Sequence, residues 1–78
     1  MSAKLIFKYD RTADILRIDA VPPDKEQETE ELGNDIIARL NPNTDDIENL
    51  EILFFLARLL RSGLLEVPIK AEFYARNA

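Results

Sequence analysis

The sequence predicts an α+β protein, with a four-stranded antiparallel sheet (a β-meander) followed by one helix packed on the sheet and a short extended C-terminal segment. Short runs with apolar residues at alternate positions are typical of half-buried strands. One late run is apolar enough to be a helix, and it stops at Gly63, a residue that favours a helix C-terminus. With 78 residues, the chain has room for a single domain spanning residues 1–78.

The first two predicted strands form a hairpin. In residues 4–9, Leu5, Phe7 and Tyr9 share one side, and residues 15–20 alternate in the same way. The short connection between them begins with Asp10, whose side chain can bond backbone amides two residues further on. Strands joined by so short a turn pair antiparallel.

An acidic stretch follows the second strand. After Val21-Pro22-Pro23 ends that strand, residues 24–31 carry five acidic side chains and one lysine. We expect a solvated loop or a frayed strand extension. A divalent-cation site is the alternative, because calcium and magnesium prefer several carboxylate and carbonyl oxygens, but no EF-hand spacing is present.

The second half of the chain completes the sheet and adds the helix. Residues 36–40 and 47–53 alternate as the third and fourth strands, separated by the turn-rich residues 41–46. The period changes near Leu53, and we expect the helix at about Phe54 to Ser62. Beyond Gly63, residues 64–70 are expected to be extended, with Pro68 favouring an edge position or no strand.

The predicted helix is more apolar than one contact face requires. Its only charged residues are Arg58 and Arg61, whereas an amphipathic surface helix keeps a wide polar side. One helix about 10–12 Å across cannot cover four strands at about 4.8 Å spacing. We therefore expect a homodimer through the helix, with a different protein partner or a monomer covered by its own C-terminal segment as alternatives. The predicted interaction surface is formed by Phe54, Phe55, Leu56, Leu59 and Leu60.

Composition excludes several classes of function. Cysteine and histidine are absent, so disulfides, thiolate metal sites and histidine bases are excluded. The net charge of −5 disfavours nucleic acid and anionic membranes as partners. No run resembles a signal peptide or a membrane span, and the cytoplasm is the expected compartment. The sequence predicts no cofactor and no metal site.

Three carboxylates are candidates for chemistry. Asp10 and Asp14 flank the first hairpin turn, and Glu51 lies in the strand leading into the apolar run. Together they could do acid–base work or hold a metal, which makes a small carboxylate-based hydrolase or a metal-binding enzyme the alternative function. Both aspartates also suit a turn, and Glu51 could pair with Arg39 or Arg17 across the sheet. We expect a non-enzymatic interaction module.

A spaced pattern resembles a known family. It consists of Tyr9-Asp10, Ala13-Asp14, Leu16 and Ile18, Ile36-Ile37, and Leu50-Glu51-Ile52-Leu53. These residues resemble the small bacterial family catalogued as domain of unknown function 2283, over Lys4 to about Leu60. The resemblance implies an antiparallel sheet with one helix and no activity.

This sequence departs from the family pattern at two places. Asn49 stands where the family often has glycine, and Leu65 to Ala78 extend past its usual end. By analogy with toxin-like gene neighbours, an antitoxin-like role is a further alternative, with residues 24–31 contacting a basic protein.

Overall fold

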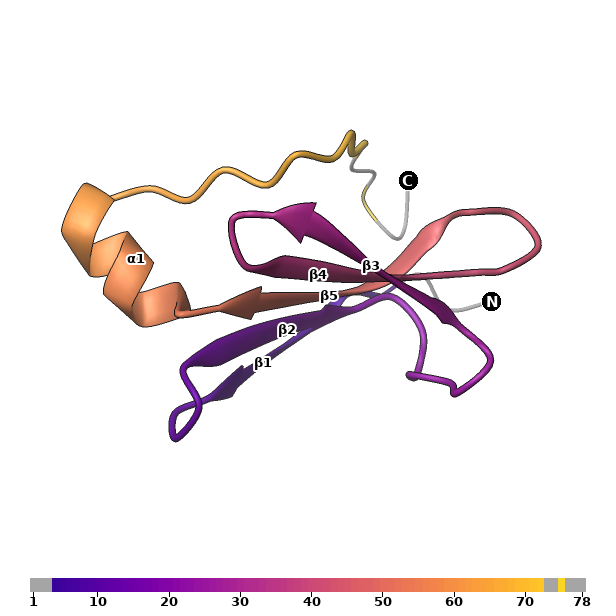
Figure 1. Cartoon of the computed structure of the whole chain (residues 1–78), viewed down its shortest axis with the longest axis horizontal. Coiled ribbons are helices and arrows are strands. Elements are labelled where there is room, and N and C mark those ends of the chain that lie inside the picture. Colours follow the sequence, from indigo (N-terminus) through magenta and orange to yellow (C-terminus); the bar gives the residue numbers. More distant parts are fainter. Residues whose placement is uncertain (1–3, 73–74, 76–78) are drawn as a thin grey trace.

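The computed structural model describes residues 4–72 and residue 75 and has the predicted α+β class, with one antiparallel sheet and one helix (Figure 1). Within the described residues the elements are β1 (Ile6–Asp10), β2 (Ile15–Asp19), β3 (Glu28–Gly33), β4 (Ile36–Leu40), β5 (Ile47–Leu53) and α1 (Phe55–Ser62). The helix begins one residue later than predicted. The prediction of four strands is wrong, because the sheet has five.

The additional strand is β3, which lies in the acidic stretch where we expected a loop. It pairs antiparallel with β4 through a tight turn at Asn34 and Asp35. Both turn residues have positive φ (53° and 60°), as the type I′ turns of short hairpins require. Of the β3 side chains only Leu32 is partly buried. An outer strand can stay solvated, so it lacks the apolar alternation that identifies strands in a sequence.

The strand order is β1-β2-β5-β4-β3, so the predicted β-meander is also wrong. The last strand, β5, is inserted between β2 and β4 and pairs antiparallel with both. It is the longest strand, and it buries Asn49, Leu50 and Ile52. A strand with so many buried residues is most stable in the centre of a sheet, where neighbours cover both of its sides.

One face of the sheet forms the core. Register places Ile36 opposite Ile52 and Ala38 opposite Leu50, and these residues make up the buried apolar cluster. Alternate residues of a strand share a face, so β2 contributes to the same face, where two of its three apolar residues pack against the cluster. The alternation predicted for these strands is confirmed.

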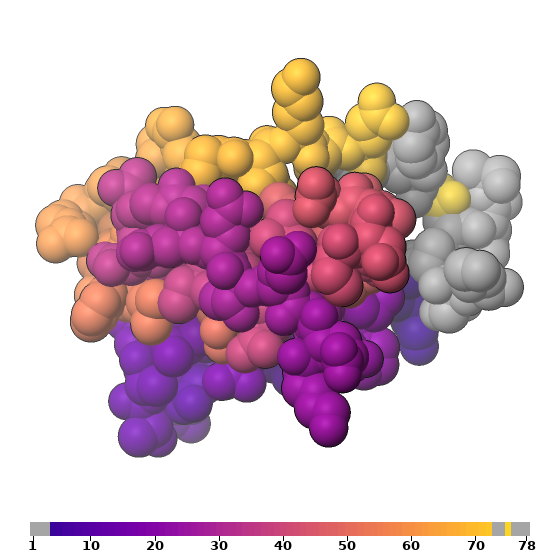
Figure 2. Space-filling model, turned by 45° about the vertical axis from the view of Figure 1, so that its right-hand side comes forward, coloured from indigo at the N-terminus to yellow at the C-terminus, as the bar shows by residue number. Residues whose placement is uncertain are grey.

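The C-terminal segment covers this face, whereas the helix lies beyond the end of β5 (Figure 1). From Gly63 the chain turns back and runs along the sheet, and Leu65, Val67 and Ile69 pack against the core cluster. In the space-filling view the segment after Gly63, coloured orange to yellow, lies along the upper side of the strands (Figure 2). Gly63 has φ 76° and its amide bonds the Leu59 carbonyl at 2.7 Å, which confirms the predicted helix C-terminus.

Candidate interaction surface

The N-terminus of helix α1 is capped by an aspartate from a turn that is distant in the sequence. Asp14, in the β1–β2 turn, accepts the amides of Leu56 at 2.8 Å and Ala57 at 3.2 Å through its carboxylate. Its carbonyl also accepts the amide of Phe55 at 3.1 Å. The first amides of a helix have no partner within the helix. Asp14 supplies the cap that Phe54, at the N-cap position, does not provide.

The same carboxylate binds the hydroxyl of Tyr9, which donates to Oδ1 at 2.7 Å. The Leu56 amide, then the Tyr9 hydroxyl, lower the pKa of Asp14 below its ordinary 3.8, because each stabilises the charged form. Accordingly the hydrogen bond to Asp14 raises the pKa of Tyr9 above its ordinary 10.0. The Tyr9 ring also meets Phe55 edge to face, with centroids 5.9 Å apart.

Asp10 and Glu51 likewise have structural partners. Oδ1 of Asp10 accepts the amides of Thr12 at 3.0 Å and Ala13 at 3.1 Å, as predicted for an Asx turn. Glu51 pairs with Arg17 across β2 and β5 at 3.4 Å, one of the two partners expected for it.

The structure places the three candidate carboxylates in separate interactions. The two aspartates share one hairpin but bond different amides, and Glu51 lies in the central strand. Among the described residues, no group of three or more carboxylates is arranged to hold a metal ion.

The predicted apolar surface divides into inward and outward residues. Phe55 packs against the core cluster, and Leu59 is partly buried. Phe54, Leu56 and Leu60 are exposed, Leu60 to 77% of its surface. Leu56 and Leu60 stand four residues apart on one side of the helix. We call this pair the outer helix stripe.

Phe54 is held in a costly backbone conformation. Its φ of 55° lies in the left-handed region, which costs a residue with a Cβ roughly 1–2 kcal/mol. The other non-glycine residues with positive φ in the described part of the chain are three aspartates and one asparagine, residue types that tolerate this region. Even so, Phe54 remains 55% exposed. The strand-to-helix turn thus projects an aromatic ring outward.

Strand β1 is the second exposed apolar element. Every residue of β1 is exposed, and Phe7 is 61% exposed. The strand lies at one edge of the sheet, paired only with β2 among the described strands. Sequence reasoning identified this strand but not its exposure, because the exposure follows from a strand order that local patterns do not encode.

Polar side chains form a hydrogen-bonded group at the end of the sheet that is away from the helix. The side-chain amide of Asn49, which is only 2% exposed, donates to Asp19 Oδ1 at 2.8 Å and to the Val21 carbonyl at 2.7 Å. Gln27 donates to Asn49 at 2.7 Å and to Glu48 at 2.8 Å. Sequence analysis missed this group, although a polar residue between apolar strand positions is its local signal.

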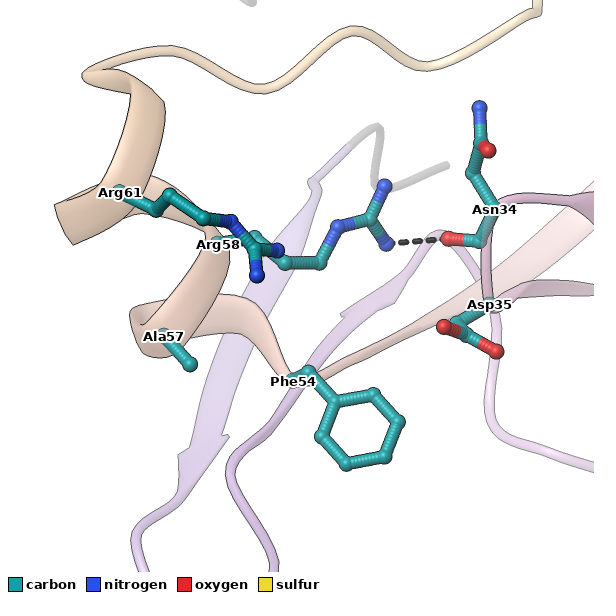
Figure 3. Close-up of a pocket in the computed structure, with 6 residues that line it drawn as sticks. All are labelled: Asn34, Asp35, Phe54, Ala57, Arg58 and Arg61. Atoms are coloured by element: carbon teal, nitrogen blue, oxygen red, sulfur yellow. Dashed lines mark hydrogen bonds between the residues drawn. The ribbon is translucent and has the colours of Figure 1, made fainter.

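A hollow of about 440 Å³ lies between the helix and the β3–β4 turn (Figure 3). Arg58 and Arg61 line one side of it, with Phe54 and Asp35 on the other. Arg58 donates to the carbonyl of Asn34 and so ties the helix to the turn. Because Asp35 adds a carboxylate to the lining, the hollow does not favour an anion.

The chain matches a family model described as "Protein of unknown function (DUF2283)" over residues 6–55. It belongs to this family. The match confirms the resemblance drawn from the sequence. A search of curated proteins and a search of solved structures returned no match. No helix in residues 4–72 is long and apolar enough to cross a membrane.

The family motif has a structural explanation in this DUF2283 chain. The β1–β2 turn and the helix cap are formed by its residues Tyr9, Asp10, Ala13 and Asp14. The matched region ends where the helix begins. Most of α1 and the whole C-terminal segment follow it. The motif therefore specifies the contact between the β1–β2 turn and the start of α1. The outer helix stripe lies outside the match.

Proposed function

We propose that the protein is a non-enzymatic protein–protein interaction module that self-associates through its exposed apolar residues. The observation that supports this proposal most is the exposure of the outer helix stripe, Leu56 and Leu60, together with Phe54. Burying one such side chain contributes about 1.5–3 kcal/mol. A domain of this size has a small core of its own, so association adds substantially to its stability.

The conformation of Phe54 supports the same proposal independently. Its backbone is in the left-handed region and its ring is more than half exposed. Strained residues persist where function requires them, and contact with another subunit would bury the ring.

Sedimentation velocity over a concentration series up to tens of micromolar tests the proposal. We expect the wild-type chain to associate, because the apolar residues of α1 are covered in the complex. Leu56→Gln combined with Leu60→Gln should shift the association to higher concentration. Arg61→Gln, an exposed change on the same helix, is the matched control and should leave it unchanged.

A strictly monomeric wild-type chain that also fails to bind an apolar dye would contradict the proposal. Dye binding by a monomer, with loss of dye binding in the double glutamine variant, would point to a different protein as the partner of the same surface. Circular dichroism of each variant verifies that the sheet is retained.

A further inference from the structure

We propose that a second copy of this chain pairs with the outer edge of β1, antiparallel and with Phe7 of each copy on the two-fold axis. The two sheets then continue into one. This inference rests on the proposed function: it names the partner and adds, beside the outer helix stripe, a second contact through which the module self-associates. It follows from the direction of the backbone groups in β1, from the charges along it and from the contrast with the other edge.

The hydrogen-bonding direction in β2 is fixed by one bond. The amide of Ala20 donates to the Glu48 carbonyl at 2.9 Å, and the β2–β5 register continues from this pair to Ile18 opposite Leu50. Hydrogen-bonded pairs alternate along an antiparallel ladder. Ile18 therefore directs its backbone groups toward β5, and its neighbours in β2 direct theirs toward β1.

The direction in β1 follows from the same alternation. Arg17, next to Ile18, bonds toward β1, where it stands opposite Lys8. The residues on either side of Lys8, Phe7 and Tyr9, consequently direct their N–H and C=O groups away from the sheet, and Leu5 continues the pattern. Every second backbone group along this edge is available to another strand.

Charge favours the register centred on Phe7 over the two registers next to it. With Phe7 on the axis, Lys4 of each copy lies opposite Asp10 of the other, and Lys8 lies opposite Ile6. Both amides that bond Asp10 use Oδ1, so Oδ2 remains available to the lysine. Opposite charges directly across an antiparallel pair stabilise it, and like charges destabilise it. Moving the axis to Lys8 would place that lysine opposite itself, and moving it to Ile6 would place Lys4 opposite Lys8.

The same register buries apolar residues on the core face. The two Phe7 rings, each 61% exposed in the monomer, become neighbours at the axis, and Leu5 of one copy lies opposite Tyr9 of the other. Aromatic pairs across strands are stabilising. Because Tyr9 and the Leu56 amide share Asp14 Oδ1, Leu5 of the second copy also comes beside the start of α1.

The opposite edge of the sheet is protected against pairing. Strand β3 carries Glu28, Glu30 and Glu31, all exposed, and its register with β4 shifts between Glu31 and Gly33. Charges and bulges on an edge strand prevent edge-to-edge association. The β1–β2 register runs without a shift, and its lysines meet no like charge in the proposed pair. The contrast favours a closed two-fold dimer through β1.

Single cysteines test the register, since the natural chain has none. Opposed residues of an antiparallel pair have Cα atoms about 4.5–5.5 Å apart, which a disulfide can span. Phe7→Cys should therefore form a covalent dimer under mild oxidation. Lys8→Cys should not, because its copies lie about 8 Å apart. A mixture of Ile6→Cys and Lys8→Cys chains should cross-link to each other.

Proline at the axis tests the backbone contact separately. Phe7→Pro removes an N–H that points away from β2, so the intramolecular ladder is retained. Compared with Phe7→Ala, which keeps the N–H, we expect Phe7→Pro to raise the dimer dissociation constant by an order of magnitude or more. Sedimentation gives the constants, and circular dichroism verifies the fold of both variants.

The outcomes separate this inference from the proposed function. If the wild-type chain associates while Lys8→Cys cross-links as readily as Phe7→Cys, the register is wrong and the interaction module stands. Oligomers that grow steadily with concentration would indicate β1 pairing with the acidic β3 edge of the next copy, and would overturn the two-fold dimer. A wild-type monomer with no cross-linking at Phe7→Cys would overturn both.

Discussion

At the start of helix α1, Asp14 joins parts of the chain that are 42 residues apart. Its carboxylate accepts helix amides and a tyrosine hydroxyl at once, from a turn where its own φ is 57°. Aspartate tolerates that conformation, and its charge is favourable at the positive end of a helix. A single aspartate therefore adopts the positive φ of the turn, caps the helix and accepts the tyrosine hydroxyl.

Replacing Asp14 tests this arrangement. Asp14→Asn should lower the melting temperature near neutral pH, because a neutral amide cannot accept all of these bonds. The folded-state pKa of Asp14 is depressed, so its contribution is complete above the ordinary value of 3.8 and is lost as the pH falls through the folded-state pKa. The melting temperatures of the wild-type chain and the Asp14→Asn variant should thus converge in acid. A difference that persists unchanged below about pH 3 would contradict the assignment.

Asn49 is the corresponding residue at the other end of the sheet. Asn49→Ala removes the amide that donates to the Asp19 carboxylate and one of the two acceptors of the Gln27 amide. We expect a loss of about 1–3 kcal/mol in the free energy of unfolding, measured by urea denaturation. Asn43→Ala, in an exposed turn, is the control and should change it by less than about 0.5 kcal/mol. Equal effects at the two positions would show that the hydrogen-bonded group adds no stability.

At the scale of elements, local pattern predicted the helix and every strand with alternating apolar residues. Strands β1, β2, β4 and β5 alternate, and α1 ends at the predicted glycine. Strand β3 was not predicted because its pairing is made by backbone hydrogen bonds and all of its side chains except Leu32 are exposed. The strand order was not predicted either. Alternation specifies which residues face the core, but leaves open which strand lies in the centre.

The end of α1 allows a quantitative test. Gly63 has φ 76°, and an added Cβ would meet no atom within 4 Å. Gly63→Ala should therefore cost only its backbone strain, about 1 kcal/mol in the free energy of unfolding. Gly63→Asn, with a residue that tolerates positive φ, should cost less. A cost of several kcal/mol for Gly63→Ala would contradict this account, because it would require a steric clash of the added Cβ.

The candidate surface shows the same limit of sequence information. The composition of α1 identified Phe54, Leu56 and Leu60 as residues that the sheet does not cover. It did not distinguish them from Phe55 and Leu59, which face inward, because that depends on the Asp14 cap. The exposed edge of β1 required the strand order, which only the assembled sheet provides.

At the scale of the whole molecule, the C-terminal segment takes the place that a second layer has in larger α+β proteins. The helix is too short and too far to one side to cover the core face, and the extended chain after it does so (Figure 1). This arrangement leaves the outer helix stripe unused within the monomer. The cover of the core face and the exposure of the outer helix stripe thus both follow from the return of the chain after Gly63.

Adjacent leucines test that account. Leu65 packs against the core cluster, whereas Leu64, its neighbour, is 57% exposed. Leu65→Asp should lower the free energy of unfolding by about 2 kcal/mol or more, because it removes apolar contact and places a carboxylate against the core. Leu64→Asp should change it by less than about 0.5 kcal/mol. Urea denaturation compares the two, and similar losses at both positions would mean that the segment does not cover the sheet.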